Sequence, residues 1–181
     1  MKKLLLLGSA ALAFGGAAPA FAQATGQVDV NGFVEGRCQF TTLGNAVINL
    51  GEISDGDGKL DEAAVDAGQA TLQGFCNGSA ATIKVEALPL LNSASASSSF
   101  DNRVDYRATA TAGNAAPIDD SDDAGAGADV GLGLFSGNIV VDISDSASPN
   151  DRLMVAGDYV GSIIVTLTPN SGIEEEGPGE P

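Results

Sequence analysis

The stretch Gln27-Val28-Asp29-Val30-Asn31-Gly32-Phe33-Val34 decides how the fold of this chain is completed. Its alternation is typical of an extended strand, whose successive side chains point to opposite faces. One face carries Val28, Val30, Gly32 and Val34, and the other carries Gln27, Asp29, Asn31 and Phe33. Burial of three valines would contribute roughly 5–9 kcal/mol, which is comparable to the net stability of a whole domain. We therefore expect this strand to be covered, in its own domain or in a neighbouring one.

The residues before this strand form a predicted export signal. Lys2 and Lys3 precede an apolar run over residues 4–14, and the small residues around position 22 form a cleavage site. We expect residues 1–22 to be removed. The apolar run is too short for a membrane anchor, so we expect no membrane insertion after processing.

The mature chain is strongly acidic. The leader holds two of the eight Lys and Arg residues and none of the 24 acidic residues, so the mature chain has a formal charge of −18. Such a surface disfavours nucleic acid and anionic membranes as partners. Solubility is the simplest interpretation of the acidity, with cation binding or contact with a basic partner as the alternatives.

The two cysteines predict one disulfide. Cys38 and Cys76 are the only cysteines in the chain, and a pair in an exported protein is typically oxidised. Closing a loop of this length would stabilise the fold by about 4 kcal/mol. A reactive pair is disfavoured because the two residues lie far apart and lack a CxxC context.

The rest of the mature chain has the pattern of an all-β protein. Short strand-like segments are separated by clusters of Gly, Asp and Ser. They are residues 37–42, 46–53, 70–76, 81–88, 103–111, 132–143 and 159–168. Seven such segments in one domain favour a single antiparallel β-sandwich.

Three further local predictions concern turns and loops. Asn77-Gly78 predicts a tight β-hairpin between segments 70–76 and 81–88. The acidic stretch 54–68 and the Ala/Gly/Asp-rich stretch 112–130 are predicted as surface loops, the second too poor in bulky apolar groups to build core. The acidic tail 170–181 is expected to be disordered.

Four motifs, in their order and spacing, resemble the chaperone–usher pilus subunits, in particular their spore coat protein U-like branch. They are Val-Asp-Val-Asn-Gly-Phe-Val-Glu-Gly-Arg-Cys at 28–38, Ala-Val-Ile-Asn-Leu-Gly-Glu-Ile at 46–53, Leu-Gln-Gly-Phe-Cys-Asn-Gly at 72–78 followed by Thr-Ile-Lys-Val at 82–85, and Val-Ala-Gly-Asp-Tyr-Val-Gly-Ser-Ile-Ile-Val-Thr-Leu-Thr at 155–168. The match spans nearly all of the mature chain.

This resemblance implies an incomplete immunoglobulin-like sandwich over residues 37–169, completed by a donor strand within the N-terminal extension 23–36 of a neighbouring subunit. The donor residues would be Val28, Val30, Gly32 and Val34, and the acceptor groove would include Ile163, Val165 and Leu167. Identical or related pilin subunits, a periplasmic chaperone and an outer-membrane usher are the implied partners. The implied function is a structural subunit of a surface pilus or fimbria of a Gram-negative bacterium, which supports adhesion or biofilm formation.

Two alternatives to this interpretation remain open. Residues 27–34 could form the first strand of a self-contained sandwich, and the protein could then be a free secreted or periplasmic module that binds a ligand or cation through its acidic loops. Asp55, Asp57 and Asp61 have a partial calcium-loop spacing, but Ile53 and Ala64 occupy two essential ligand positions. A loose calcium contact here or at residues 119–123 is the remaining cation hypothesis.

Enzymatic chemistry has little support in the sequence. The chain has no histidine, and hence no ordinary triad base and no imidazole metal ligand. Its acidic residues fall in predicted surface loops, where solvation explains them better than a catalytic pair does. We expect no catalytic site, no resident metal and no cofactor.

Overall fold

The computed structural model describes residues 25–42 and 45–170. Contacts divide the chain into a segment ending at Phe33 and a body beginning at Val34. The predicted signal peptide 1–22, the turn residues 43–44 and the acidic tail beyond Asn170 lie outside the described residues. No described helix has the length and apolar character needed to cross a membrane.

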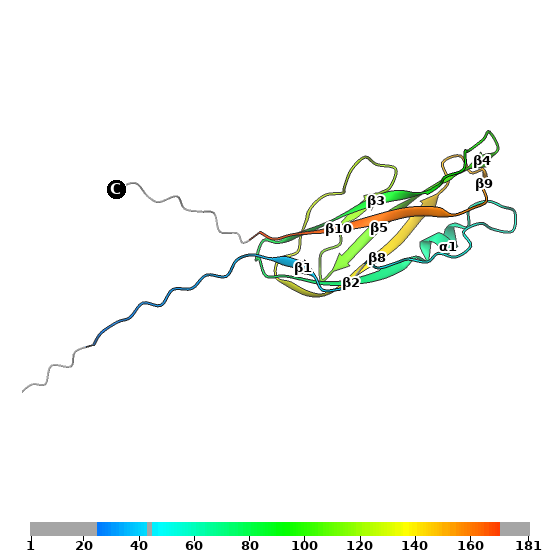
Figure 1. Cartoon of the computed structure of the whole chain (residues 1–181). Coiled ribbons are helices and arrows are strands. Elements are labelled where there is room, and N and C mark those ends of the chain that lie inside the picture. Colours follow the sequence, from blue (N-terminus) through cyan, green and yellow to red (C-terminus); the bar gives the residue numbers. More distant parts are fainter. Residues whose placement is uncertain (1–24, 43–44, 171–181) are drawn as a thin grey trace, which may run out of the picture. The chain divides into compact units, whose positions relative to one another are not determined.

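The body is an all-β structure, which confirms the predicted class (Figure 1). Its strands are β1 (Cys38–Phe40), β2 (Gln69–Cys76), β3 (Thr82–Asn92), β4 (Phe100–Asp101), β5 (Arg103–Ala112), β6 (Ile118–Asp120), β7 (Val130–Gly131), β8 (Phe135–Ala147), β9 (Leu153–Met154) and β10 (Tyr159–Thr168). One short helix, α1 (Glu62–Asp66), lies between β1 and β2 in the chain.

One antiparallel sheet forms most of the body. Its strand order is β1-β2-β8-β5-β3-β10, with β6 beside β5 and β7 beside β3, while β4 and β9 form a separate parallel pair. The long strand β5 joins the two halves, because its first residues pair with β3 and the remainder pairs with β8. The sheet curls until its two edge strands, β1 and β10, contact each other. The result is a nearly closed barrel around one core.

Alternating residues of the central strands fill this core. The buried apolar side chains of β3, β5 and β8 are Ile83, Val85, Ala87, Leu90, Val104, Tyr106, Ala108, Ala110, Ala112, Ile139, Val141 and Ile143. Every second residue of a strand points to the same face, so these segments place one face inward and leave most of their polar residues outside, with Asn92 and Ser146 as buried exceptions. The alternation in the sequence therefore gives the observed strands directly.

The predicted hairpin at Asn77-Gly78 is wrong. β2 pairs with β1 and β8, whereas β3 pairs with β5 and β10, so the two strands that flank the turn do not pair with each other. The side chain of Asn77 instead accepts a hydrogen bond from the backbone N–H of Arg37 and donates one to the carbonyl oxygen of Glu35. Asn77 thus holds the chain before β1, and the segment after it crosses to the other half of the sheet.

Two segments predicted as loops contain ordered structure. In 54–68, Asp61 caps α1 by accepting a hydrogen bond from the Ala64 N–H, and Val65 is fully buried. The prediction that 112–130 builds no core is wrong, because β6 lies there and Ala115 is buried. Small alanine side chains allow close packing there. Conversely, residues 46–53, predicted as a strand, form no β-ladder with any described residue.

Candidate functional site: an open apolar groove beside β10

Strand β10 is an edge of the sheet with an unfilled side. Among the described residues its ladder partner is β3 alone. Ile163, Val165 and Leu167 lie opposite the buried residues Ala87, Val85 and Ile83, so they face the core. Within residues 25–42 and 45–170, no strand pairs with the backbone groups on the other side of β10. An edge of this kind is a template for another strand.

The wall opposite β10 comes from residues 45–50 and β1. Val47 is exposed, while Ile48 and Leu50 pack against the core cluster. The strand-like pattern of this segment is present, but no strand pairs with it among the described residues. Both walls therefore carry the sequence of sheet strands, and the position between them is empty.

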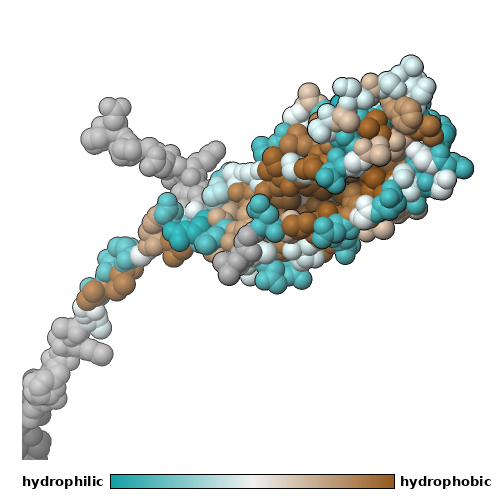
Figure 2. All heavy atoms as spheres, turned by 45° about the vertical axis from the view of Figure 1, so that its right-hand side comes forward, coloured by the Kyte–Doolittle hydropathy of each residue, from teal (hydrophilic) through white to brown (hydrophobic). Residues whose placement is uncertain are grey.

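A long groove runs between these walls, mainly apolar beside residues 161–165 of β10 and more polar beside residues 159–161. Figure 2 shows hydrophobic side chains gathered along a hollow in the body. One half has a cavity volume of about 750 Å³ and the other about 900 Å³. The first half borders residues 161–165 of β10 and the second borders residues 159–161. The two halves share the residues Val47, Ile48, Leu50, Leu90 and Gly161.

The buried ring of Tyr106 forms part of the floor of this groove. Its hydroxyl lies 2.7 Å from the carbonyl oxygen of Leu88 and 3.2 Å from that of Ser162. Burial raises the pKa of Tyr106 to about 12, so the phenol is neutral at physiological pH. The floor is therefore uncharged and its polar atom already has partners.

An irregularity in β3 shapes the middle of the groove. Val160 lies opposite Leu91 and Ser162 opposite Leu88, so β3 has one residue more than β10 over this stretch. Gly161 faces this bulge, and a Cβ atom there would lie 2.8 Å from the carbonyl oxygens of Leu88 and Pro89. Position 161 thus has no room for a side chain. Leu90 bounds the groove at this position instead.

The groove closes at the end of β10. Leu167 is not among the residues that line it, and its Cδ1 lies 3.3 Å from where a Cβ of Gly74 on β2 would stand. Of the three predicted acceptor residues, Ile163 and Val165 line the groove and Leu167 packs at its closed end.

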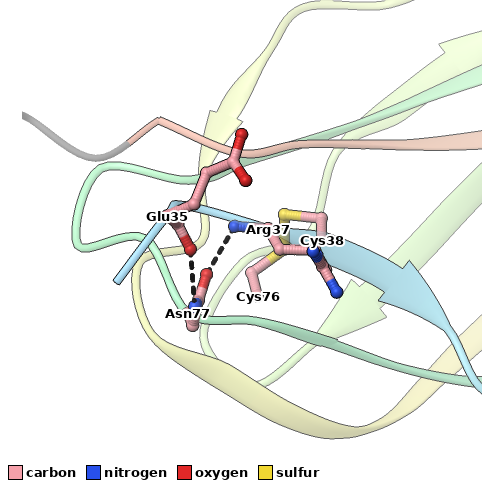
Figure 3. The surroundings of a disulfide bond; sticks show 5 residues. All are labelled: Glu35, Arg37, Cys38, Cys76 and Asn77. Atoms are coloured by element: carbon pink, nitrogen blue, oxygen red, sulfur yellow. Dashed lines mark hydrogen bonds between the residues drawn. A yellow bond between two sulfur atoms is a disulfide. The ribbon is translucent and has the colours of Figure 1, made fainter. Parts of the chain in front are cut away.

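The disulfide predicted between Cys38 and Cys76 is present (Figure 3). The two cysteines lie directly opposite each other in the β1–β2 ladder, so the bond ties β1 to the sheet. The Asn77 side chain bridges Glu35 and Arg37 just before β1. These contacts hold one wall of the groove and fix the point at which the N-terminal segment leaves the body.

The predicted donor residues are exposed in the single chain. The side chains of Val28, Val30 and Val34 are 86%, 89% and 79% exposed, and no heavy atom lies within 4 Å of where a Cβ of Gly32 would stand. Residues 25–37 form no β-ladder with any other described residue. Three valines on one face of a strand pattern are thus left in solvent.

The acidic loops contain no metal site that the structure reveals. Within 25–42 and 45–170, no group of three or more His, Cys, Asp or Glu side chains is placed to hold a metal ion. Asp55 accepts hydrogen bonds from the backbone N–H groups of Asp57 and Lys59. Asp119 accepts one from the N–H of Ala87, and Asp120 pairs with Arg107.

Comparisons with protein-family models, with curated protein sequences and with solved structures found no match. The case for a function therefore rests on the geometry of the groove and of the N-terminal segment. Sequence reasoning found β10 but missed Tyr106 and Leu90 as groove residues. The signals that point to this region are Pro89 inside a strand, which marks an edge or bulge, and Gly161 in a strand interior.

Proposed function

We propose that this protein is a structural subunit of a surface pilus or fimbria, in which the N-terminal strand of one copy completes the sheet of the next. The observation that carries the proposal is the coexistence of an empty apolar groove beside edge strand β10 and an exposed segment with three valines that pairs with no described residue of the same chain. In this proposal the body is an incomplete immunoglobulin-like sandwich, and Val28, Val30, Gly32 and Val34 of the neighbour supply its missing strand.

The energetics of strand addition support this assignment. An added strand gains main-chain hydrogen bonds along β10, and its alternate side chains enter the groove and set specificity. Covering three exposed valines contributes roughly 5–9 kcal/mol from the donor alone, before the groove residues are counted. The chain therefore has both halves of a strong interface, which it leaves unused as a single copy.

The same features explain the assembly route that the resemblance implies. A long exposed edge with an apolar groove is an aggregation hazard for a free subunit. We propose that a periplasmic chaperone covers the groove until an outer-membrane usher exchanges the chaperone for the next subunit. The finished pilus would lie on the cell surface, where it supports adhesion or biofilm formation.

The test is the state of the protein on the surface of its producing cells. We expect a ladder of SDS-resistant oligomers in unheated samples from cells that make the full chain. Deletion of residues 23–34 should reduce the ladder to a monomer band, and so should Val30→Asp, which places a charge in the groove. Asn31→Asp is the matched control, because it adds the same charge on the opposite face and should preserve the ladder.

Two results would contradict the proposal. One is a monomer band from cells that make the wild-type chain, which would favour the free secreted or periplasmic β-sandwich. The other is a ladder that survives both the deletion and Val30→Asp, because assembly would then use a different surface. A melting curve of each purified variant checks that the body is folded.

A further inference from the structure

The outer face of the β3–β10 edge carries an apolar surface, and two of its residues, Val160 and Ile164, also border the groove. Val160 lies opposite Leu91, and their side chains are 71% and 50% exposed. Leu88 and Ile164 are also exposed on this face, since each lies opposite a residue that points away from the core. We call this surface the outer patch, formed by Leu88, Leu91, Val160 and Ile164.

The N-terminal segment has an apolar residue on its second face as well. Phe33 is 79% exposed, and the alternation of residues 27–34 places it opposite the face of Val34 and Gly32. If the valines enter the groove, Phe33 faces outward from the added strand. The outward neighbours of that strand across β10 are Val160, Ser162 and Ile164, which include the edge of the outer patch.

We infer that Phe33 of one copy packs on the outer patch of a second copy, opposite Val160, and that this contact fixes the register in which copies join. The inference rests on the proposed function. Aromatic and β-branched side chains directly opposite each other on neighbouring strands form favourable pairs. Phe33, Val160 and Leu91 would make one apolar row across three strands.

The groove independently favours this register for an antiparallel donor. With Phe33 opposite Val160, Gly32 lies opposite Gly161, at the junction of the two groove halves where Leu90 bounds the space. The remaining opposite pairs are Val34 with Tyr159, Val30 with Ile163, and Val28 with Val165. A shift of the donor by two residues in either direction would place Val30 or Val34 opposite Gly161. Gly32 would then lie beside one of the two groove halves, where there is space for a larger side chain.

The lengths of donor and groove agree with this placement. Residues 159–165 of β10 line the groove, and residues 28–34 are the same number of residues. The donor cannot extend past Val34 without releasing contacts of its own body, because Asn77 binds the Glu35 carbonyl oxygen and the Arg37 N–H. The donor therefore fills the groove and ends at its Tyr159 end.

The register is tested by pairwise cysteine cross-linking in the full chain on producing cells. Asn31→Cys is combined in turn with Val160→Cys, Ser162→Cys or Ile164→Cys, and oxidised samples are boiled without reductant. In the inferred register Asn31 lies opposite Ser162, so the Asn31/Ser162 pair should give dimers and higher oligomers. The other two pairs correspond to registers shifted by two residues and should remain monomeric.

The contact itself is tested by Phe33→Ser and Val160→Ser. Each should lower the temperature at which the unboiled ladder dissociates, the double variant should add little to either single one, and Asn31→Ser should have no effect. Cross-linking at position 160 or 164 instead of 162, or an unchanged dissociation temperature for Phe33→Ser, overturns the inference while the wild-type ladder upholds the proposed function. A wild-type chain without a ladder overturns both.

Discussion

The hydroxyl of Tyr106 on β5 donates a hydrogen bond to the carbonyl oxygen of Leu88 on β3 over 2.7 Å. The ring of Tyr106 lies in the floor of the groove, and the carbonyl oxygen of Ser162 on β10 is also within 3.2 Å of the hydroxyl. One side chain thus connects the core strand β5, the bulge in β3 and the edge strand β10. Tyr106 therefore contacts, from the core side, the edge strand β10 that we propose to accept a donor strand.

Tyr106→Phe should lower the free energy of unfolding by about 0.5–1.5 kcal/mol at neutral pH, which is the usual contribution of one such hydrogen bond. Burial raises the pKa of Tyr106 to about 12, above its value of about 10 in an unfolded chain. The wild type should therefore lose stability as the pH rises from about 10 to about 12, by up to about 1.4 kcal/mol per pH unit.

The alkaline loss due to Tyr106 should be absent from the Tyr106→Phe variant. The measurement is urea unfolding of both proteins at several pH values between neutral and strongly alkaline. Equal slopes of stability against pH in the two proteins would show that ionisation of Tyr106 does not cause the alkaline loss of stability.

Gly161→Ala should destabilise the body by about 1–3 kcal/mol, as overpacking does. A Cβ at position 161 would lie 2.8 Å from the backbone carbonyl oxygens of Leu88 and Pro89, so β3 and β10 would have to separate. Gly131→Ala is the control, because no heavy atom lies within 4 Å of a Cβ there. Thermal unfolding of the two variants compares them, and equal midpoints would refute the steric role of Gly161.

Asp119→Ala should cost about 1–3 kcal/mol of stability, because it leaves a buried N–H group without its acceptor. The Oδ2 atom of Asp119 accepts the hydrogen bond of the Ala87 N–H at 2.8 Å, and the side chain is buried. Asp119→Asn keeps an acceptor oxygen and should be milder. The exposed Asp122→Ala is the control, and denaturant unfolding that ranks it with Asp119→Ala would contradict this prediction.

Replacing Cys38 and Cys76 together by serine should destabilise the body by about 4 kcal/mol, as expected for a loop of this length. Because the bond holds β1 to β2, the groove wall formed by Phe40 and the following segment should also loosen. Urea unfolding reports the first effect. The second should appear as loss of the SDS-resistant ladder at a temperature where the body of the double variant is still folded.

The sequence predicted some elements well for a clear physical reason. Residues 159–168 were predicted as a strand and form β10 with the same bounds, because the alternating residues Ile163, Val165 and Leu167 are followed by Pro169, which cannot continue a ladder. The disulfide was predicted because a chain with a predicted export signal and two cysteines offers one pairing. The local sequence pattern is enough to predict β10, and the number of cysteines is enough to predict the disulfide.

Other features depend on contacts that no local pattern contains. Asn77-Gly78 has the composition of a hairpin turn, but the Asn77 side chain is used by Glu35 and Arg37. The core in 112–130 was missed because alanine counts as weakly apolar until a neighbouring strand covers it. Tyr106 and Leu90 could not be identified as groove residues, since the groove exists only where β10 and residues 45–50, far apart in the sequence, form opposite walls.

The most direct test of strand donation is amide hydrogen exchange of residues 27–34 in oligomers taken from the cell surface, compared with the Val30→Asp monomer. In the single chain these residues form no β-ladder, so their amides should exchange rapidly in the monomer. If the strand is donated, the amides that point toward β10 should be strongly protected in the oligomer, in an alternating pattern along the segment. Rapid exchange of all of residues 27–34 in the oligomer would contradict strand donation.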